Sequence, residues 1–268
     1  MSFKPLIVLL PFVLFIYGCD LIEYHPYDAR VNGSTGINRK NIERIEQLCK
    51  GKDTIRFAVI SDTQRWYDET EQMVKIINSN DSIDFVIHCG DLTDFGITKE
   101  FQWMRRELNK LKAPYVCLIG NHDCLGTGEH VFTKIWGNVN FAFTAGDTRF
   151  VCLNTNAREY DHTVSVPDFS FISEEQDSFP STARRTIVAM HAKPYSEQFD
   201  NNIAKVFEYM ILRFPNLAFC LCGHDHKFLA EDIFDDGNIY YECTSAGKRG
   251  FLIFTLYPNG YEYKEVYF

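Results

Sequence analysis

The sequence has no excess of basic residues. It contains 27 Lys and Arg against 36 Asp and Glu, which gives a formal net charge of −9 and a pI near 5.4. A protein that binds the backbone of a nucleic acid needs a broad positive face to displace its counterions. The composition offers no such face, so we expect no nucleic-acid partner. A small anionic substrate would need local positive charge, which bound metal ions can supply.

The sequence also lacks a hydrophobic run long enough to span a bilayer as a helix. Lys4 precedes an apolar run from 6 to 17, which is too short for a span and typical of a signal peptide over residues 1–18. Residues 16–19 resemble a bacterial lipobox, although Tyr17 departs from its usual small residue. This resemblance implies acylation of Cys19 and a lipid-anchored, extracytoplasmic protein of the cell envelope. An ordinary cleaved signal with a chance cysteine is the alternative.

Internal repeats and low-complexity segments are absent, and the length suits one α/β domain. Residues 19–52 are rich in Asn, Gly, Ser and charged groups, with a possible helix over 39–49. We expect them to form a tether, followed by a catalytic domain over residues 53–268.

Nine cysteines are present, and most of them lie inside apolar runs that predict buried strands. We therefore expect small core residues rather than a disulfide framework. Cys49 and Cys124 lie outside such runs and are the ones expected at the surface.

Short runs rich in β-formers recur along the chain, with segments of helical periodicity over 69–78, 99–112 and 202–213. This alternation predicts a largely parallel sheet covered by helices. The strand-like runs span 55–60, 84–89, 115–119, 149–153, 186–190 and 217–221. Three aromatic-rich runs over 239–243, 251–257 and 261–268 predict a second, mainly antiparallel sheet packed on the first.

Oxygen and imidazole donors follow five of the predicted strands. Because the carboxyl ends of strands in an α/β sheet gather at one edge, we expect these donors to converge although they are distant in sequence. Carboxylate, amide and imidazole ligands together suit Mn, Fe or Zn. The donors are Asp62 and Gln64, Asp91, Asn121, His191, and His224 and His226.

The same blocks resemble those of the calcineurin-like metallophosphoesterase family. GDLTD begins at Gly90, GNHD at Gly120 and GHDH at Gly223, and a lone His191 stands before Ala-Lys-Pro. The resemblance covers about residues 55–245, with all the blocks in order. It implies an α/β fold, a four-layer α/β/β/α sandwich of two mixed sheets.

The resemblance also implies two divalent metal ions and their ligands. Asp62, Asp91 and His226 would hold the first ion, and Asp91 would be shared with the second. The ligands of the second ion would be Asp91, Asn121, His191 and His224. Gln64 stands where the family usually has histidine, and its amide oxygen is a weaker ligand than imidazole.

The chemistry implied by the family is hydrolysis of a small phosphomonoester or phosphodiester by water activated between the two ions. His122 would be the general acid that protonates the leaving oxygen, and Asp94 would orient it by hydrogen bonding. Two alternatives are a nuclease of the same family and a metal-binding lipoprotein with little turnover.

Further polar and aromatic residues lie within or beside these blocks. Asp123 and Asp225 are expected to hydrogen-bond to the backbone or to ligand histidines. Arg65 and Lys193 either bind phosphate or are solvated surface charges. Tyr195, which follows the fourth block, either stacks on a substrate group or simply packs.

Overall fold

The computed structural model describes residues 25, 27–160 and 164–268. The predicted signal peptide and Cys19 lie outside the described residues. None of the helices in the described part of the chain combines the length and the apolar composition needed to cross a bilayer.

The first sheet has five strands in the order β11-β10-β1-β2-β3. Its strands β1, β2 and β3 are parallel, whereas β10 pairs antiparallel with β1, and β11 pairs antiparallel with β10. Their bounds are Ile55–Ile60 for β1, Phe85–His88 for β2, Tyr115–Cys117 for β3, Gly250–Tyr257 for β10 and Gly260–Tyr267 for β11.

The second sheet has six strands in the order β4-β5-β6-β7-β9-β8, of which β5, β6, β7 and β9 are parallel. The antiparallel strands β4 and β8 form its two edges. The bounds are Phe141–Ala145 for β4, Thr148–Leu153 for β5, Arg185–Met190 for β6, Leu217–Cys222 for β7, Leu229–Asp232 for β8 and Ile239–Glu242 for β9.

The prediction that the C-terminal strands form a separate antiparallel sheet is wrong. Strand β9 joins the second sheet, while β10 and β11 extend the first. The chain crosses between the sheets at Ser245, which forms a parallel bridge with Ser61 just beyond β1. Backbone pairing with distant strands, rather than local composition, decides where these segments lie.

The two sheets pack face to face through phenylalanine side chains. Phe57 stacks on Phe85 in the first sheet and meets Phe150 of the second edge-on at 5.4 Å between ring centroids. Alternation along β1 sends Phe57 and Val59 into this central core and Ala58 and Ile60 toward the helices. The side chains between the sheets thus form the middle of a sandwich.

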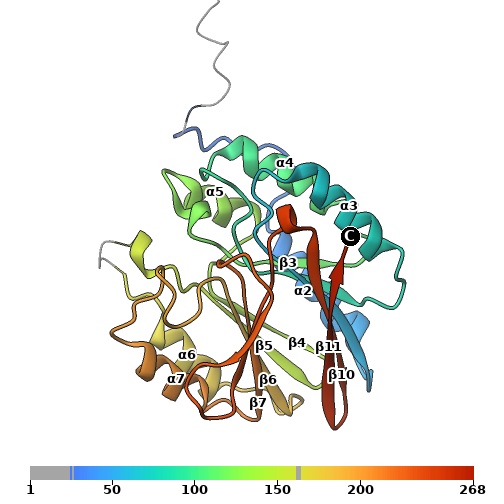
Figure 1. The fold of residues 1–268 in the computed structure, drawn as a ribbon, viewed down its shortest axis with the longest axis vertical. Coiled ribbons are helices and arrows are strands. Elements are labelled where there is room, and N and C mark those ends of the chain that lie inside the picture. The colour runs from blue at the N-terminus through green and yellow to red at the C-terminus, as the bar shows by residue number, and fades with distance from the viewer. Residues whose placement is uncertain (1–24, 26, 161–163) are drawn as a thin grey trace, which may run out of the picture.

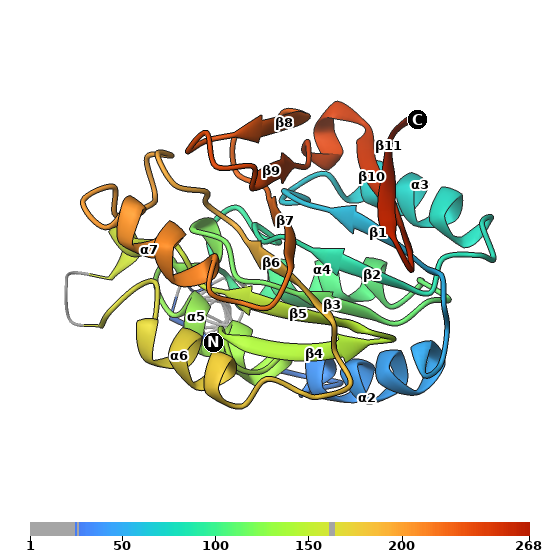
Figure 2. The same cartoon turned by 90° about the horizontal axis from the view of Figure 1, so that it is seen from below.

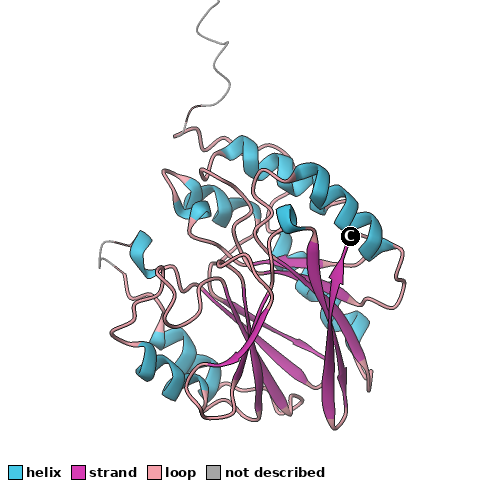
Figure 3. Ribbon diagram, viewed as in Figure 1, coloured by secondary structure: helices cyan, strands magenta, loops and turns pink. Residues whose placement is uncertain are grey.

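Helices cover the outer faces of both sheets (Figure 1, Figure 3). Those that cover the first sheet are α3 (Tyr67–Asn78), α4 (Thr98–Leu108) and α5 (Gly128–Ile135), and those that cover the second are α6 (Phe169–Asp177) and α7 (Ala204–Ile211). Short 3-10 turns lie at η2 (His122–Cys124), η3 (Ala157–Glu159) and η4 (Ala246–Lys248). The expected four-layer α/β/β/α sandwich of two mixed sheets is confirmed.

Helix α2 (Ile37–Cys49) lies across β3 and β4, the edge strands of the two sheets (Figure 2). Ile45 and Cys49 are fully buried in the central core, and Asn38 and Asn41 hydrogen-bond to the carbonyl groups of Cys117 and Tyr115. The compact domain therefore begins before the boundary predicted at residue 53. A helix that closes the open side of the sandwich buries too much apolar surface to act as a tether.

The eight described cysteines are all free thiols. Seven of them are buried, and Cys124 is half-buried. The expectation that Cys49 is exposed is wrong, because α2 turns its last residue into the core.

Candidate metal centre

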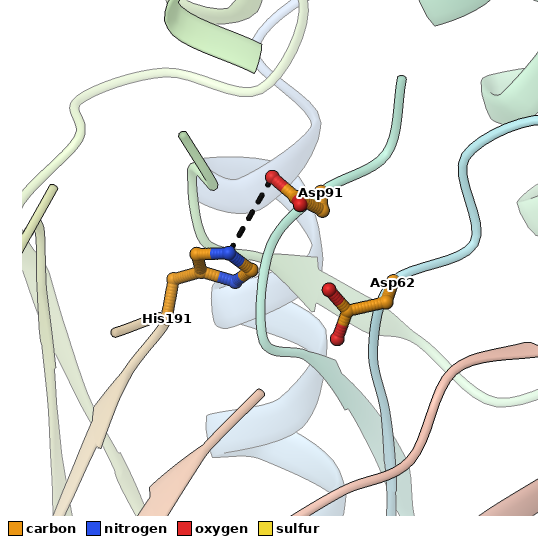
Figure 4. Close-up of side chains that lie close together, drawn as sticks. All are labelled: Asp62, Asp91 and His191. Atoms are coloured by element: carbon orange, nitrogen blue, oxygen red, sulfur yellow. Dashed lines mark ion pairs between the residues drawn. The ribbon is translucent and has the colours of Figure 1, made fainter. Parts of the chain in front are cut away.

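The strand ends bring the predicted donor residues together at one edge of the sandwich. Asp62 follows β1, Asp91 follows β2 and His191 follows β6 (Figure 4). One ligand atom from each of these three buried residues lies within 4.8 Å of the others. Hydrogen bonds between the loops maintain this arrangement: Asp62 N donates to Gly90 O, and Gly223 N donates to His191 O.

The protonation of His191 leaves acceptor atoms facing one another. Its Nδ1 lies 2.7 Å from the carbonyl oxygen of Cys89, which can only accept, so Nδ1 carries the proton in the neutral ring. Nε2 is then an acceptor, yet it faces Asn121 Oδ1 at 3.1 Å and Asp91 Oδ1 at 3.4 Å. A second proton or a cation is needed among these atoms.

The electrostatic effect of this arrangement is strong. Burial favours the neutral ring, but the Asp91 carboxylate outweighs burial and raises the pKa of His191 to about 10. The site thus attracts positive charge, which a metal ion would supply in place of the proton.

Asp62, His224 and His226 complete the centre on its other side. Asp62 Oδ2 accepts a hydrogen bond from His224 N, whereas the buried Oδ1 has no hydrogen-bond partner among the described residues. His226 Nε2 lies only 3.1 Å from that oxygen, and His224 Nδ1 lies 3.2 Å from Asn121 Oδ1. A buried, unpartnered carboxylate oxygen beside an imidazole nitrogen is the arrangement expected of metal ligands. The residues therefore fit divalent cations.

An open cleft of about 470 Å³ gives access to these residues. It is wide enough for a small organic phosphate. The lining residues are Asp91, Asn121, His122, Tyr195, Ser196, Glu197, His224, Asp225 and His226.

The backbone at the site is strained. Five of the candidate ligands have a left-handed φ, a conformation that costs non-glycine residues about 1–3 kcal/mol each. Such strain persists only where the surrounding structure enforces it, and here it turns each side chain inward after a strand end. The φ values are 52° at Asp62, 38° at Gln64, 59° at Asp91, 82° at His224 and 56° at His226.

The sequence model of the family described as calcineurin-like phosphoesterase matches residues 55–228. The chain belongs to the calcineurin-like phosphoesterase family. The matched region contains every candidate ligand, from Asp62 to His226. The family is typically dependent on divalent metal ions, in agreement with the donor atoms gathered here.

Two curated relatives of this phosphoesterase are named for cyclic nucleotides. A 3′,5′-cyclic-nucleotide phosphodiesterase of Nostoc sp. is 25% identical over 154 residues, covering 54% of this chain and 56% of the relative. A probable cyclic nucleotide phosphodiesterase of Moraxella catarrhalis is 25% identical over 169 residues, covering 54% of this chain and 58% of the relative. The chain thus spans just over half the length of these relatives.

The fold has counterparts among solved structures. A dimetal phosphatase from Danio rerio superposes with a TM-score of 0.60 at 13% identity, covering 80% of this chain and 98% of that one. At this identity the likeness concerns the fold alone.

His122, the predicted general acid of this phosphoesterase, lies at the edge of the centre. Its Nε2 is 4.0 Å from Asp91 Oδ2, and its Nδ1 lies 2.8 Å from the backbone carbonyl oxygen of Asp94. Asp94 therefore contacts His122, but through its main chain. Its carboxylate instead accepts two hydrogen bonds from Arg65, at 2.8 and 3.1 Å. The prediction that the Asp94 carboxylate contacts the His122 imidazole is wrong, because that carboxylate pairs with the guanidinium of Arg65.

The structure places the remaining motif residues around Asp91. The Gln64 amide nitrogen donates to Asp91 Oδ2 at 3.3 Å. Asp123 is fully buried and accepts hydrogen bonds from the backbone of Leu92, Thr93 and Gly120, which confirms its supporting role. Among the described residues, the Asp225 carboxylate does not accept the expected hydrogen bond from backbone or histidine, but forms ion pairs with Lys193 and Lys227.

Two supporting features were not predicted from the sequence. His88 is buried beneath the site, where burial lowers its pKa to about 4, and its ring contacts Thr63 Oγ1 and Gly90 N. Lys193 is buried and bonds to Glu242 at 2.7 Å, so it is not a solvated surface charge. The sequence feature that could have indicated a supporting role for His88 is its position two residues before Gly90, where the GDLTD block begins. Nothing local links Lys193 to Glu242, which comes 49 residues later.

Proposed function

We propose that this protein is a dinuclear metal-dependent phosphodiesterase that hydrolyses a small phosphate ester. The observation that carries the proposal is the group of mutually facing acceptor atoms on Asp62, Asp91, Asn121 and His191, which requires positive charge. Family membership supports the reaction class. The open cleft supports a small substrate.

Two divalent cations bound here would neutralise a phosphate and acidify a water molecule to hydroxide near neutral pH. Asp62 and His226 would hold one cation, and Asn121, His191 and His224 would hold the other. Asp91 would contribute to both.

The protein also supplies a proton donor for the leaving oxygen. The Nδ1 proton of His122 is directed at the Asp94 carbonyl group, so its Nε2 is directed at the half-exposed side of the centre, 4.0 Å from Asp91. A protonated Nε2 there can donate to an ester oxygen bound beside Asp91. A site that only stores metal would have no use for this group.

A diester is the favoured substrate class, and cyclic nucleotides are its leading members. The names of the two curated relatives support them. The acidic Glu197 of the cleft also favours a singly charged diester over a doubly charged monoester.

Purified protein stripped of metal and reloaded with Mn²⁺ is expected to hydrolyse bis(p-nitrophenyl) phosphate faster than p-nitrophenyl phosphate. Release of p-nitrophenol and of 5′-AMP from 3′,5′-cyclic AMP would be measured with Mn, Fe and Zn. A fully loaded protein that turns over none of these would support the metal-binding alternative. Faster hydrolysis of the monoester would reverse the assigned substrate class.

Replacing His122 by alanine is expected to lower turnover by about 100- to 10,000-fold, because proton transfer to the leaving oxygen is lost. The loss should be larger for cyclic AMP, whose leaving group is an alkoxide, than for bis(p-nitrophenyl) phosphate, whose leaving group needs little protonation. The measurement is kcat for both substrates at saturating Mn²⁺, with metal content determined in parallel.

The matched control for this substitution is His130→Ala, since His130 is exposed on α5 and lies outside the cleft lining. It should retain wild-type activity. An equal loss on both substrates would argue that His122 stabilises the site without transferring a proton.

A further inference from the structure

Tyr195 combines two features that neither packing nor metal binding explains. It lines the cleft beside His224 and His226, and 52% of its surface is exposed. Single exposed aromatic residues are common on protein surfaces and need no functional account. Tyr195 differs because its backbone φ is +67°, a conformation that bulky side chains rarely adopt.

Hydrogen bonds with the Asn201 side chain stabilise this backbone conformation. The backbone N–H of Tyr195 donates to Asn201 Oδ1 at 2.8 Å, and Asn201 Nδ2 donates to the carbonyl oxygen of Ser196 at 3.0 Å. On the other side, Ser196 N donates to the carbonyl oxygen of Lys193, whose side chain is anchored on Glu242. Hydrogen bonds therefore hold the backbone at Tyr195 and Ser196 from both directions along the chain.

The ring of Tyr195 is also supported from behind. It packs against Phe234 with 5.5 Å between centroids and 41° between planes. Phe234 in turn packs against the core between the second sheet and α7. A supported ring that keeps half of its surface exposed in a cleft offers a flat apolar platform.

We propose that Tyr195 is a specificity-determining residue that stacks on a planar aromatic group of the substrate, such as the base of a nucleotide. This inference rests on the proposed phosphodiesterase function. It places the phosphate at the metal ligands and the aromatic ester group over Tyr195, both within the one cleft.

The charges of the cleft agree with a neutral aromatic group. Glu197 lies two residues after Tyr195 and lines the same cleft, and the described lining contains no lysine or arginine. Additional phosphates beyond the one at the metal ligands would meet like charge there. The subsite therefore fits a nucleoside monophosphate ester better than a polyphosphate.

The test compares two inhibitors that differ by the base alone. With Mn²⁺-loaded full-length protein and bis(p-nitrophenyl) phosphate as reporter, the inhibition constants of 5′-AMP and ribose 5-phosphate would be measured. Stacking of a base on an aromatic side chain is worth about 10- to 100-fold in affinity, so 5′-AMP should bind more tightly by this factor. Tyr195→Ala should abolish the difference, and Tyr195→Phe should preserve it.

Two controls separate the possible failures. Tyr209→Ala removes a similarly exposed tyrosine from α7, outside the cleft lining, and should leave both inhibition constants unchanged. Equal inhibition by the two compounds, or a difference that survives Tyr195→Ala, would overturn the stacking role while the phosphodiesterase function stands. Absence of reporter hydrolysis in the loaded wild type would instead overturn the function and the subsite with it.

Discussion

Replacing Asp91 by asparagine is expected to lower turnover by about 1,000-fold or more. Removal of one group that stabilises a developing charge costs about 100- to 1,000-fold, and in the proposed mechanism Asp91 would contribute to both cation sites. It also accepts hydrogen bonds from Gln64 Nε2 and from the backbone N–H of His122, so its charge organises the whole centre. The measurement is kcat/KM for bis(p-nitrophenyl) phosphate across a Mn²⁺ titration, together with bound metal per chain.

Asp225→Asn is the matched control for this substitution. Asp225 lines the same cleft but forms ion pairs with Lys193 at 3.5 Å and Lys227 at 3.3 Å. It should keep most of the wild-type activity and full metal content. An Asp91→Asn protein that retained activity within about tenfold of wild type would rule out a shared ligand at this position.

Replacing Gly120 by alanine is expected to abolish activity and to destabilise the fold. A Cβ at Gly120 would stand 2.1 Å from both the backbone nitrogen and Oδ1 of Asp91. The backbone nitrogen cannot move aside without shifting the loop after β2, and overpacking of this kind costs about 1–3 kcal/mol. Thermal unfolding and metal-dependent turnover would both be measured.

Gly260→Ala provides the comparison. A Cβ at Gly260 meets nothing within 4 Å, and its φ lies outside the left-handed range. This variant should unfold near the wild-type temperature and remain fully active. If Gly120→Ala matched it in both respects, the tight contact between the loops that follow β2 and β3 would not be needed for the site.

The sequence was sufficient to locate the site because each candidate ligand lies within four residues after the end of a strand. Apolar runs identified β1, β2, β3, β6 and β7, and the polar residues after them were the correct ones to bring together. Parallel strands end at the same edge of a sheet, so chain order and strand direction place Asp62, Asp91 and Asn121 side by side without any tertiary information. The residue types themselves indicated a metal of borderline character.

Other features depended on contacts between distant segments, which local pattern does not encode. The aromatic strands β10 and β11 have the same composition whether they pair with β1 or with each other in a separate sheet. Helix α2 was recognisable as a helix, but only its position across β3 and β4 makes it part of the core. Short edge strands such as β4 and β8 were not predicted, because a few residues carry too little periodicity.

The amino-acid sequence by itself indicated the family through its motif blocks and, through that resemblance, the four-layer class. It also indicated the candidate metal ligands, because donor residues follow the predicted strands. The tertiary structure alone decided which partner each of these side chains has. Arg65 pairs with the Asp94 carboxylate, so His122 forms its hydrogen bond with the backbone carbonyl group of Asp94 instead. Asn201 accepts the hydrogen bond from the Tyr195 N–H that maintains the left-handed backbone of Tyr195 at the cleft. Side-chain partners are selected by distance and direction in space, and residues that compete for one carboxylate can be separated by any length of chain.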